Sequence, residues 1–510
     1  MRIAIRVDAS PAIGTGHVRR SLALAHALRD LGADVRFITR ALGTDSAAMI
    51  AAAGFKGSII LPAPDEFAAP DPAIPHSHWA QVSAQTDAAQ TAEALVEFAP
   101  DWVVLDSYAF GARWHEAMRA ALGCRIAQID DLGDRALGAD LLIDHTYSDN
   151  HRIKYNGQLT PGTRLLGGPR FALLGPAYAN APRYEHSEAV RSIGIFMGGV
   201  DADNHSAAVI AALDEAGFAG PIEVVSTSAN PNLDALRQAI DAHKGARLMV
   251  DLPDLADFFA RHDLQVGAGG GASWERCCIG VPTVLLAVAP NQLTVATQLA
   301  AKGVAAFAED TGIAEIADIL KTLIGDAPRR EAMTRRARAL VDGRGAQRAA
   351  LAMLSGALTL RPATTDDARM MFDWRGDPLT RAVSRESGAL IWEDHLAWLD
   401  RTLADPARTL MVGEIGGRPV GVIRFDKTEG GPGGSQRAEV SLYLDPALHG
   451  LGLGSQLLLS AETATDIAII DATVLEENAG SQALFARCGY TQTGPTRWEK
   501  RRLPAGNSTR

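Results

Sequence analysis

The sequence predicts an α/β protein with two doubly wound domains in tandem, followed by a smaller α+β domain. Short apolar runs alternate with amphipathic helical stretches through about the first 340 residues, which is typical of βαβ units and a parallel sheet. This pattern pauses near residue 180 and then restarts. Beyond about residue 357 the strands and helices no longer alternate. The 510 residues fit three domains at roughly 150 residues each.

We expect a first Rossmann-like domain over residues 1–178, a second over 189–356 and the α+β domain over 357–505. Residues 178–188 are rich in Pro, Ala and polar residues, as in a linker. A helical stretch over residues 329–354 is expected to close the second domain.

The predicted elements follow from apolar runs and their punctuation by glycine. In the first domain, strands are expected at residues 3–7, 35–38, 102–105 and 126–129, with a helix at 17–31. In the second domain, strands are expected at 192–197, 222–225, 264–266 and 283–286, with a helix at 205–217. In the third domain, the expected elements are a strand at 359–362, a helix at 365–374, a hairpin over 410–425 that turns at Gly416-Gly417, and a strand at 439–444.

Composition excludes several classes of function. The formal net charge of −11 argues against a nucleic-acid binder, which needs a basic face. Neither an apolar run of about 20 residues nor a signal sequence is present, so we expect a cytoplasmic protein without membrane insertion. Because Cys124, Cys277, Cys278 and Cys488 lack paired metal-ligand spacing, we expect buried thiols and no metal.

A glycine-rich turn lies between the first predicted strand and the first predicted helix. Gly14 and Gly16 allow a tight turn and close approach to a ligand, and His17 begins the helix. This is the carboxyl edge of a parallel sheet, where open α/β folds bind ligands. The positive helix end favours a neutral imidazole, so His17 is a candidate general base. By itself the turn is equally consistent with a tight connection and a polar cap.

The second domain carries three loops of the same kind. Residues 267–275 follow a strand and open a helix, whose first amides suit a pyrophosphate. Glu275 lies one turn into this helix, as a hydrogen-bond acceptor for ribose hydroxyls or as a solvated carboxylate favoured by the helix dipole. Asn291 and Gln292 are expected to project from the loop after the next strand. Residues 198–201 form the third loop.

These motifs, in this order, resemble the UDP-2,4-diacetamido-2,4,6-trideoxy-β-L-altropyranose hydrolase family of pseudaminic acid biosynthesis. The resemblance covers roughly residues 1–345 and rests on residues 6–20, 198–201, 267–275 and 291–292. It implies the two-domain GT-B architecture of certain glycosyltransferases. It also implies a metal-independent, inverting hydrolysis in which His17 activates the water that expels UDP.

The resemblance places UDP on the second domain, against Gly269, Gly270, Ser273 and Glu275. Polar residues that follow first-domain strands, including Asp131, are candidates to hold the sugar or to act as structural caps. The full set of expected UDP and substrate contacts is Asp8, Gly14, Gly16, Asp106, Tyr108, Gly199, Gly269, Gly270, Ser273, Glu275, Asn291 and Gln292.

A second kind of glycine loop lies in the third domain. The strand at 439–444 leads into residues 449–455, His-Gly-Leu-Gly-Leu-Gly-Ser, and then an apolar helix, which together make a diphosphate cradle. With the downstream segment 478–490, this resembles the GNAT N-acetyltransferase family over about residues 358–503. The resemblance implies acetyl-CoA as co-substrate, contacted by Leu444, His449, Gly450, Gly452, Gly454, Ser455, Asn478, Ser481 and Phe485.

Two features of this domain depart from the family pattern. His449 stands where Gln or Arg is more usual. Phe485 stands where many members have a Tyr that protonates the leaving thiolate, and Phe cannot donate a proton. Glu439 is a candidate to deprotonate the amine through water, or a surface carboxylate.

Together the resemblances imply a bifunctional enzyme whose partners are a UDP-linked amino sugar and acetyl-CoA. In pseudaminic acid synthesis the 4-amino group is acetylated one step before the hydrolysis, so the fusion joins successive steps. Three alternatives stay open. They are a GT-B glycosyltransferase, a hydrolase of a related legionaminic-type diacetamido sugar with a GNAT domain of other acceptor specificity, and a non-catalytic UDP-sugar sensor.

Overall fold

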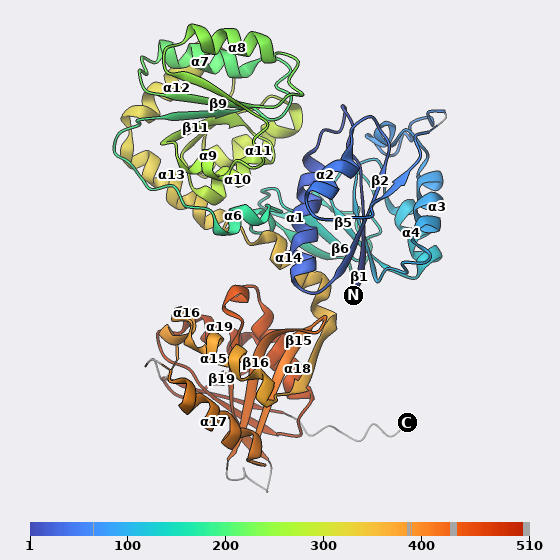
Figure 1. Cartoon of the computed structure of the whole chain (residues 1–510), viewed down its shortest axis with the longest axis vertical. Helices are drawn as coiled ribbons and strands as arrows, with labels where there is room; N and C mark the ends of the chain where they lie inside the picture. Colours follow the sequence, from blue (N-terminus) through green and yellow to red (C-terminus); the bar gives the residue numbers. More distant parts are fainter. Residues whose placement is uncertain (65, 385–387, 389, 429–435, 503–510) are drawn as a thin grey trace. The chain divides into compact units, whose positions relative to one another are not determined.

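The computed structural model describes residues 1–64, 66–384, 388, 390–428 and 436–502 (Figure 1). The chain divides into two compact units, one formed mainly by residues 2–350 and the other mainly by the residues from 351 onward. The first unit holds two parallel sheets and the second a mixed sheet. The predicted class of two Rossmann-like domains followed by an α+β domain is therefore confirmed.

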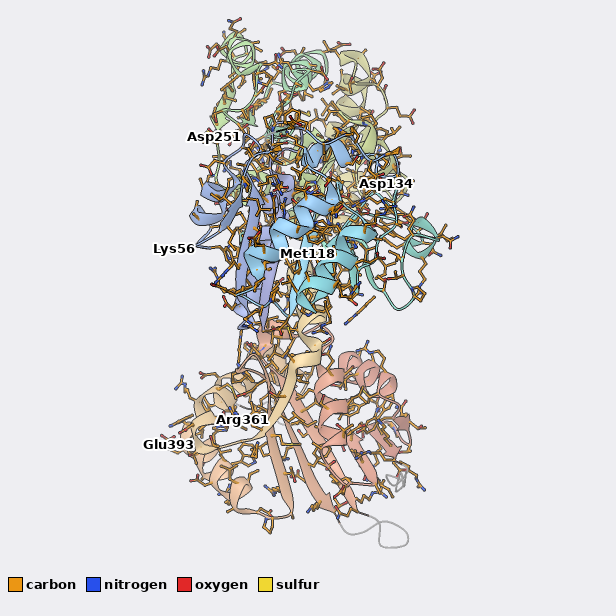
Figure 2. The ribbon with its side chains drawn as sticks, turned by 90° about the vertical axis from the view of Figure 1, so that its right-hand side faces the viewer. Lys56, Met118, Asp134, Asp251, Arg361 and Glu393 are labelled. Carbon is orange, nitrogen blue, oxygen red and sulfur yellow. The ribbon has the colours of Figure 1, made fainter. Side chains whose placement is uncertain are left out.

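The first sheet is parallel, with the strand order β3-β2-β1-β4-β5-β6-β7. Its strands are β1 (Arg2–Val7), β2 (Asp34–Arg40), β3 (Ile59–Leu61), β4 (Trp102–Asp106), β5 (Arg125–Ile129), β6 (Leu141–Asp144) and β7 (Arg164–Gly167). Helices α3 (Ala84–Leu95) and α4 (Ala112–Leu122) cover one face, and α1 (Gly16–Asp30) and α2 (Ser46–Ala52) the other (Figure 1). Met118 of α4 is wholly buried in this core (Figure 2).

The second sheet is also parallel, with the order β10-β9-β8-β11-β12-β13. Its strands are β8 (Ile193–Phe196), β9 (Ile222–Ser226), β10 (Ala246–Val250), β11 (Leu264–Ala268), β12 (Thr283–Leu286) and β13 (Ala306–Ala308). One face is covered by α7 (His205–Glu215), α8 (Leu233–Ala242) and α12 (Ile313–Gly325). The other is covered by α9 (Ala256–Ala260), α10 (Ala272–Ile279), α11 (Pro290–Ala301) and α13 (Ala327–Leu340).

The segment predicted as a linker, 178–188, is packed. Tyr178 lies in a short helix, α6 (Pro176–Asn180), and Tyr178 and Tyr184 are buried in the core beside Trp274. The two tyrosine rings supply the apolar area that fixes a segment otherwise rich in Pro and polar residues.

The helical stretch predicted over 329–354 is two helices, α13 and α14 (Gly345–Leu354). They are separated where Gly343 takes a positive φ of 83°. The start of α14 packs on the end of the first domain, because Gly345 lies against Ala172 and the Arg348 guanidinium donates to the Arg170 carbonyl oxygen at 2.8 Å.

The third sheet has the order β14-β15-β16-β17-β18-β20-β19 and is antiparallel except between β17 and β18. Its strands are β14 (Leu358–Pro362), β15 (Arg408–Ile415), β16 (Arg418–Thr428), β17 (Arg437–Leu444), β18 (Ile469–Thr473), β19 (Thr491–Gln492) and β20 (Arg497–Arg501). Helices α18 (Leu453–Thr463) and α19 (Ala479–Arg487) pack on one face, and α15 (Ala368–Gly376) and α17 (Trp392–Ala404) on the other. Two short helices complete the described set, α5 (His151–Lys154) and α16 (Pro378–Ala382).

Strands β17 and β18 diverge. β17 pairs with β16 from Arg437 to Leu444, but with β18 only from Arg437 to Glu439. Along residues 440–444, β17 therefore has no strand partner on its β18 side among the described residues. The backbone groups there need other hydrogen-bond partners.

Within the described residues, no helix has the length and apolar character needed to span a bilayer. The same residues contain no group of three or more His, Cys, Asp or Glu side chains placed to hold a metal ion. All four cysteines are buried free thiols. The expected end of the third domain at residue 505 lies outside the described residues.

Candidate active sites

His17 occupies the second position of α1, at the carboxyl edge of the first sheet. Its Nδ1 lies 2.7 Å from Oδ1 of Asp106, the last residue of β4. Because a carboxylate accepts at that point, Nδ1 carries the hydrogen and Nε2 remains to accept a proton. The His17 side chain is 9% exposed, and its ring packs edge-on against the Tyr108 ring at 4.6 Å. This is the geometry of an oriented general base.

Asp106 is itself held by three donor groups. Arg20 donates to both carboxylate oxygens, at 2.6 and 2.8 Å, and the Ser21 hydroxyl donates at 3.0 Å. Burial raises the pKa of Asp106, but Arg20 and His17 outweigh burial and hold this pKa well below its usual range. Asp106 therefore stays ionised at neutral pH. Sequence reasoning missed Arg20, although it lies three positions after His17 on the same helix face.

Further polar groups extend this cluster along the sheet edge. The Tyr108 hydroxyl donates to Asp131, and Arg20 Nη1 lies 3.4 Å from the same carboxylate. His145 Nε2 lies 4.0 Å from Asp131, and Lys154 Nζ donates to the Asp131 carbonyl oxygen at 2.6 Å. The structure thus brings Asp106, Tyr108 and Asp131 together with His17, and places His145 and Lys154 beside them. The sequence signal for His145 was its place just after the end of β6, which matches the place of Tyr108 two residues after the end of β4.

Aromatic rings lie beside these polar groups. His76 and Trp79 come from one short turn, and both ring centroids lie 5.9 Å from that of Tyr108. His76 and Trp79 are half-buried. Such rings suit the apolar face of a sugar.

Asp8 belongs to a separate buried network. It accepts from the Arg40 amide at 2.7 Å and from the Arg6 guanidinium, which also binds Asp87. The structure therefore commits Asp8 to interior bonds. Gly14 has a φ of +73°, and open space surrounds the positions that side chains at Gly14 and Gly16 would fill.

The glycine-rich loop of the second domain presents free amides at the start of α10. The Gly269 amide is not among them, because it donates a hydrogen bond to the Leu286 carbonyl oxygen at 2.9 Å. The amides of Gly270, Gly271 and Ala272 have no acceptor in the part of the chain that the structure describes. Such amides at a helix N-terminus bind phosphate oxygens.

Gln292 lies beside this loop, but not on a loop of its own. Asn291 and Gln292 were expected to project from a loop. This prediction was wrong, because Pro290 begins α11 and both residues lie in its first turn. Gln292 still reaches the site, since a Cβ at Gly269 would lie 3.4 Å from the Gln292 Cβ. The Asn291 side chain lies outside the described residues.

Glu275 and Ser273 both make contacts within the protein. The Tyr178 hydroxyl donates to the half-buried Glu275 carboxylate. Burial raises the pKa of Glu275, and the Tyr178 hydrogen bond offsets this only in part. The Ser273 side chain is buried, and its hydroxyl lies 3.4 Å from Arg276 Nη2.

The loop that contains Gly199 lies at the same sheet edge, after β8. Its conformation is fixed from both sides. The Thr227 hydroxyl donates to the Gly199 carbonyl oxygen, and the Asp201 carboxylate accepts the amides of His205 and Ser206 at the start of α7.

The glycine loop of the third domain follows β17 at the point where β17 and β18 diverge. Gly450 and Gly452 have φ angles of +76° and +85° with open space around them, and Gly452 caps α18. A Cβ at Gly454 would lie 2.5 Å from Leu484 Cδ1, so glycine there lets α18 approach α19. The Ser455 hydroxyl is buried without a hydrogen-bond partner in the described part of the chain.

The other predicted acetyl-CoA contacts surround this loop or pack nearby. His449 Nε2 lies 3.3 Å from the Leu444 carbonyl oxygen. Asn478 caps α19 by accepting the Ser481 amide at 2.9 Å. Phe485 is buried against the Tyr490 ring at 4.9 Å.

Glu439 stands at the last paired position of β17, where the two strands begin to separate. It accepts from the Thr473 hydroxyl at 2.9 Å.

This fold and these sites define a GT-B-like α/β region joined to an acetyltransferase domain. Residues 368–490 match the acetyltransferase (GNAT) family. YwnH of Bacillus subtilis, described as a candidate phosphinothricin acetyltransferase, is 31% identical over 119 residues, which are 22% of this chain and 72% of that protein. Through its C-terminal domain, the chain belongs to the acetyltransferase (GNAT) family.

The N-terminal region is distantly similar to two sugar-pathway proteins. The spore coat polysaccharide biosynthesis protein SpsG of B. subtilis is 27% identical over 216 residues, 41% of this chain, and the chain spans 62% of that protein. The UDP-2,4-diacetamido-2,4,6-trideoxy-β-L-altropyranose hydrolase of Campylobacter jejuni is 22% identical over 304 residues, 59% of this chain and 97% of that protein. The S. aureus MnaA–UDP structure shares the fold, with a TM-score of 0.50 and 14% identity over 69% of this chain and 95% of that one.

Proposed function

We propose that the chain is a bifunctional enzyme of nucleotide-sugar metabolism, with two activities that act on related substrates. The N-terminal region hydrolyses a UDP-linked amino sugar, and the C-terminal domain transfers an acetyl group from acetyl-CoA to a sugar amine. The observation that carries the hydrolase half is the His17–Asp106 pair, which leaves His17 Nε2 as a proton acceptor at a ligand-binding sheet edge.

In the proposed hydrolysis, Nε2 of His17 takes a proton from a water molecule. The water oxygen bonds to the anomeric carbon from the face opposite the diphosphate, while the bond between that carbon and the diphosphate oxygen breaks. The electron pair of the broken bond leaves on UDP, and the sugar is released with inverted configuration. Asp106 stabilises the imidazolium that forms.

The amides of Gly270, Gly271 and Ala272 are proposed to receive the diphosphate, with Glu275 and Gln292 beside them. These amides stabilise the negative charge that develops on the leaving group. The mechanism requires the His17 edge and the Glu275 edge to serve the same substrate molecule.

The substrate class is taken from the relatives. The C. jejuni protein is named for a UDP-2,4-diacetamido-2,4,6-trideoxy-β-L-altropyranose, which supports a diacetamido trideoxy sugar of the pseudaminic acid pathway here. The half-buried His76 and Trp79 rings beside Tyr108 suit the deoxygenated, methyl-bearing side of such a sugar.

For the acetyltransferase half, the proposal rests on the divergence of β17 and β18 beside the glycine loop. On the β18 side of β17, where residues 440–444 have no strand partner among the described residues, the backbone can bond to the pantetheine arm of acetyl-CoA. The loop over 450–455 can receive the pyrophosphate of acetyl-CoA. The acceptor is the 4-amino group of the UDP-sugar that precedes the hydrolase substrate. Glu439, at the fork of the two strands, is proposed to take the amine proton through water.

The proposal is tested by incubating the full chain with a UDP-diacetamido sugar and no acceptor. A hydrolase releases stoichiometric UDP and free sugar, whose anomeric configuration NMR reads directly. A glycosyltransferase releases little UDP without its acceptor, and a sensor binds the sugar but releases none. A panel of isomers then separates the altro-configured substrate from legionaminic-type sugars.

The transferase half is tested on the same chain with acetyl-CoA and a UDP-4-amino sugar. Release of free thiol together with the N-acetylated nucleotide sugar supports it. Acetyl-CoA binding without transfer to this amine would mean that the acceptor belongs to another class.

A further inference from the structure

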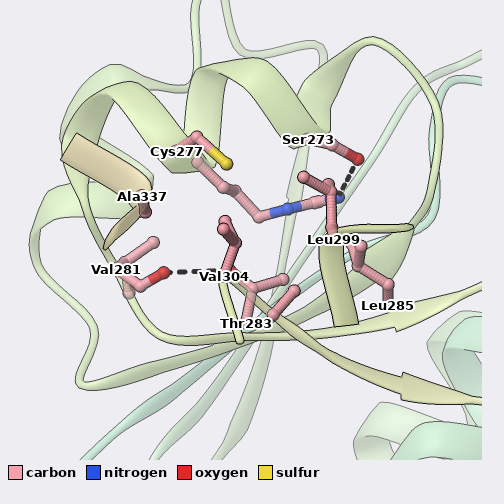
Figure 3. A pocket seen from close by; sticks show the side chains of 10 residues that line it. Ser273, Cys277, Val281, Thr283, Leu285, Leu299, Val304 and Ala337 are labelled. Atoms are coloured by element: carbon pink, nitrogen blue, oxygen red, sulfur yellow. Dashed lines mark hydrogen bonds between the residues drawn. The ribbon is translucent and has the colours of Figure 1, made fainter. Parts of the chain in front are cut away.

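The glycine-rich loop of the second domain rests on a buried cation. Arg276 is only 1% exposed, whereas the preceding residue of α10, Glu275, is half-buried. Its Nη2 donates to the Ala268 carbonyl oxygen at 2.6 Å. The same atom lies 3.4 Å from the Ser273 hydroxyl (Figure 3). Both partners belong to the loop or to its first helical turn.

Within the part of the chain that the structure describes, no ion pair neutralises the charge of Arg276. Its Nε and Nη1 atoms have no hydrogen-bond partner among the residues that the structure describes, and no carboxylate in that set forms a salt bridge with it. Arg6 and Arg40 are equally buried but pair with Asp87. Burial lowers the pKa of Arg276 to about 10, which still leaves it charged at neutral pH. A buried, unpaired charge is costly unless a counter-charge arrives.

The space beside Arg276 is small. A cavity of about 10 Å³ is lined by Ser273, Arg276, Cys277 and Thr283, and apolar side chains make up most of the rest (Figure 3). That is about the smallest volume that holds one water molecule. Gly267 is required beside the guanidinium, since a Cβ there would collide with Nη1.

Arg276 also fixes where the loop begins. The peptide group between Ala268 and Gly269 is bound on both sides, because its carbonyl oxygen accepts from Arg276 and its amide donates to Leu286. The next three amides are those of Gly270, Gly271 and Ala272, which have no acceptor among the described residues. The Arg276 guanidinium is therefore bonded to the same loop that presents the free amides.

We propose that Arg276 is a positioning residue that serves as the built-in counter-charge for the phosphate groups of a nucleotide bound on this loop. The inference rests on the proposed nucleotide site. It assigns the affinity for the diphosphate to a buried charge as well as to the loop amides. A unit charge several ångströms from an anion, at an effective dielectric constant of about 20, changes affinity by about tenfold or more.

The test compares UDP with uridine, which lacks phosphate, by calorimetry on the full chain. The ratio of the uridine Kd to the UDP Kd measures the contribution of the phosphates alone. Arg276→Met, which keeps much of the volume and removes the charge, should lower this ratio about tenfold or more and leave uridine affinity within about twofold.

Arg330→Met is the matched control. Arg330 is wholly buried in α13 of the same domain, and its guanidinium is held by the carbonyl oxygens of Leu323, Ile324, Ser187 and Glu188. Its loss should leave the ratio unchanged even where it lowers stability. An equal fall of the ratio in both variants would overturn the inference.

Arg276→Lys decides the case if Arg276→Met does not fold. Lysine keeps the charge but not the bonds of the planar guanidinium. A ratio within about threefold of wild type supports the counter-charge, and a ratio lowered about tenfold overturns it. If the wild-type chain binds neither UDP nor uridine, the proposed function fails. If wild type binds UDP and the Met variant keeps its ratio, only the inference about Arg276 fails.

Discussion

The Nδ1 atom of His17 lies 2.7 Å from the Oδ1 atom of Asp106, although the two residues stand 89 positions apart in the chain. The parallel pairing of β1 with β4 brings their carboxyl ends together and so creates this contact. It fixes one tautomer of the imidazole and leaves Nε2 as the reactive nitrogen.

The first prediction concerns this pair. His17→Asn should lower kcat for UDP release by about 10²–10⁴-fold, because a general base is lost, while UDP affinity stays within about twofold. Asp106→Asn should also lower kcat, because an amide no longer favours the same tautomer. Steady-state UDP release and calorimetry measure both effects.

His26→Asn is a suitable control for that experiment, since His26 lies on the same helix and packs against Phe55. It should retain wild-type turnover. Near-wild-type kcat in His17→Asn would remove His17 from the mechanism.

The second prediction concerns the protonation of Glu275. Burial raises its pKa above the ordinary value of 4.5, so the protonated form persists to higher pH than in a free glutamate. Ribose hydroxyls donate to the ionised carboxylate. Uridine affinity should therefore rise as pH increases through the raised pKa and level off above it.

Uridine is the ligand of choice for this measurement because it carries no titrating phosphate. Calorimetry between about pH 4 and 8 should show the rise in wild type and a flat profile in Glu275→Gln. Identical profiles in both would mean that Glu275 does not contact the ribose.

The third prediction concerns stability at low pH. In His115, the Nδ1 atom accepts from the Gly138 amide at 3.0 Å and Nε2 lies 2.9 Å from the Gln128 side-chain oxygen, so the folded chain uses the neutral ring. Burial lowers the pKa of His115 to about 4. The unfolded chain takes up the proton first, near pH 6.5, so this stabilisation is complete above about pH 6.5 and is lost as pH falls toward 4.

The expected loss from His115 is at most about 3 kcal/mol, at about 1.4 kcal/mol per pH unit. Thermal unfolding between about pH 7 and 4 measures it. His115→Gln, which can keep both hydrogen bonds, should show a shallower decline than wild type. A decline of equal slope in the two proteins would contradict the assignment.

The fourth prediction concerns the glycine loop of the acetyltransferase domain. Gly452→Asp should abolish acetyl-CoA binding, because a carboxylate would face the pyrophosphate. Gly452→Asn is the matched control. Asn has nearly the same size and tolerates the left-handed φ of +85°, but it carries no charge. Calorimetry should show weakened but measurable binding in Gly452→Asn, and equal loss in both would point to sterics alone.

The sequence by itself determined many of the elements and their order. The strand predicted at 283–286 is β12 (Thr283–Leu286), and the predicted turn at Gly416-Gly417 joins β15 to β16 with φ angles of +60° and +80°. These features depend on local periodicity and on glycine conformation, which neighbouring residues encode. The loops that carry His17 and Gly452 were found for the same reason.

The tertiary structure decided which of the predicted residues act together. Asp8 and Asp106 both end or follow first-sheet strands, yet Asp8 is committed to Arg6 and Arg40, whereas Asp106 orients His17. Nothing in the local sequence distinguishes Arg276 from an exposed arginine on a helix, yet in the fold it is buried beneath the glycine-rich loop of the second domain. Hydrogen-bond partners and burial depend on which distant strands and helices pack together, and no local pattern encodes that packing.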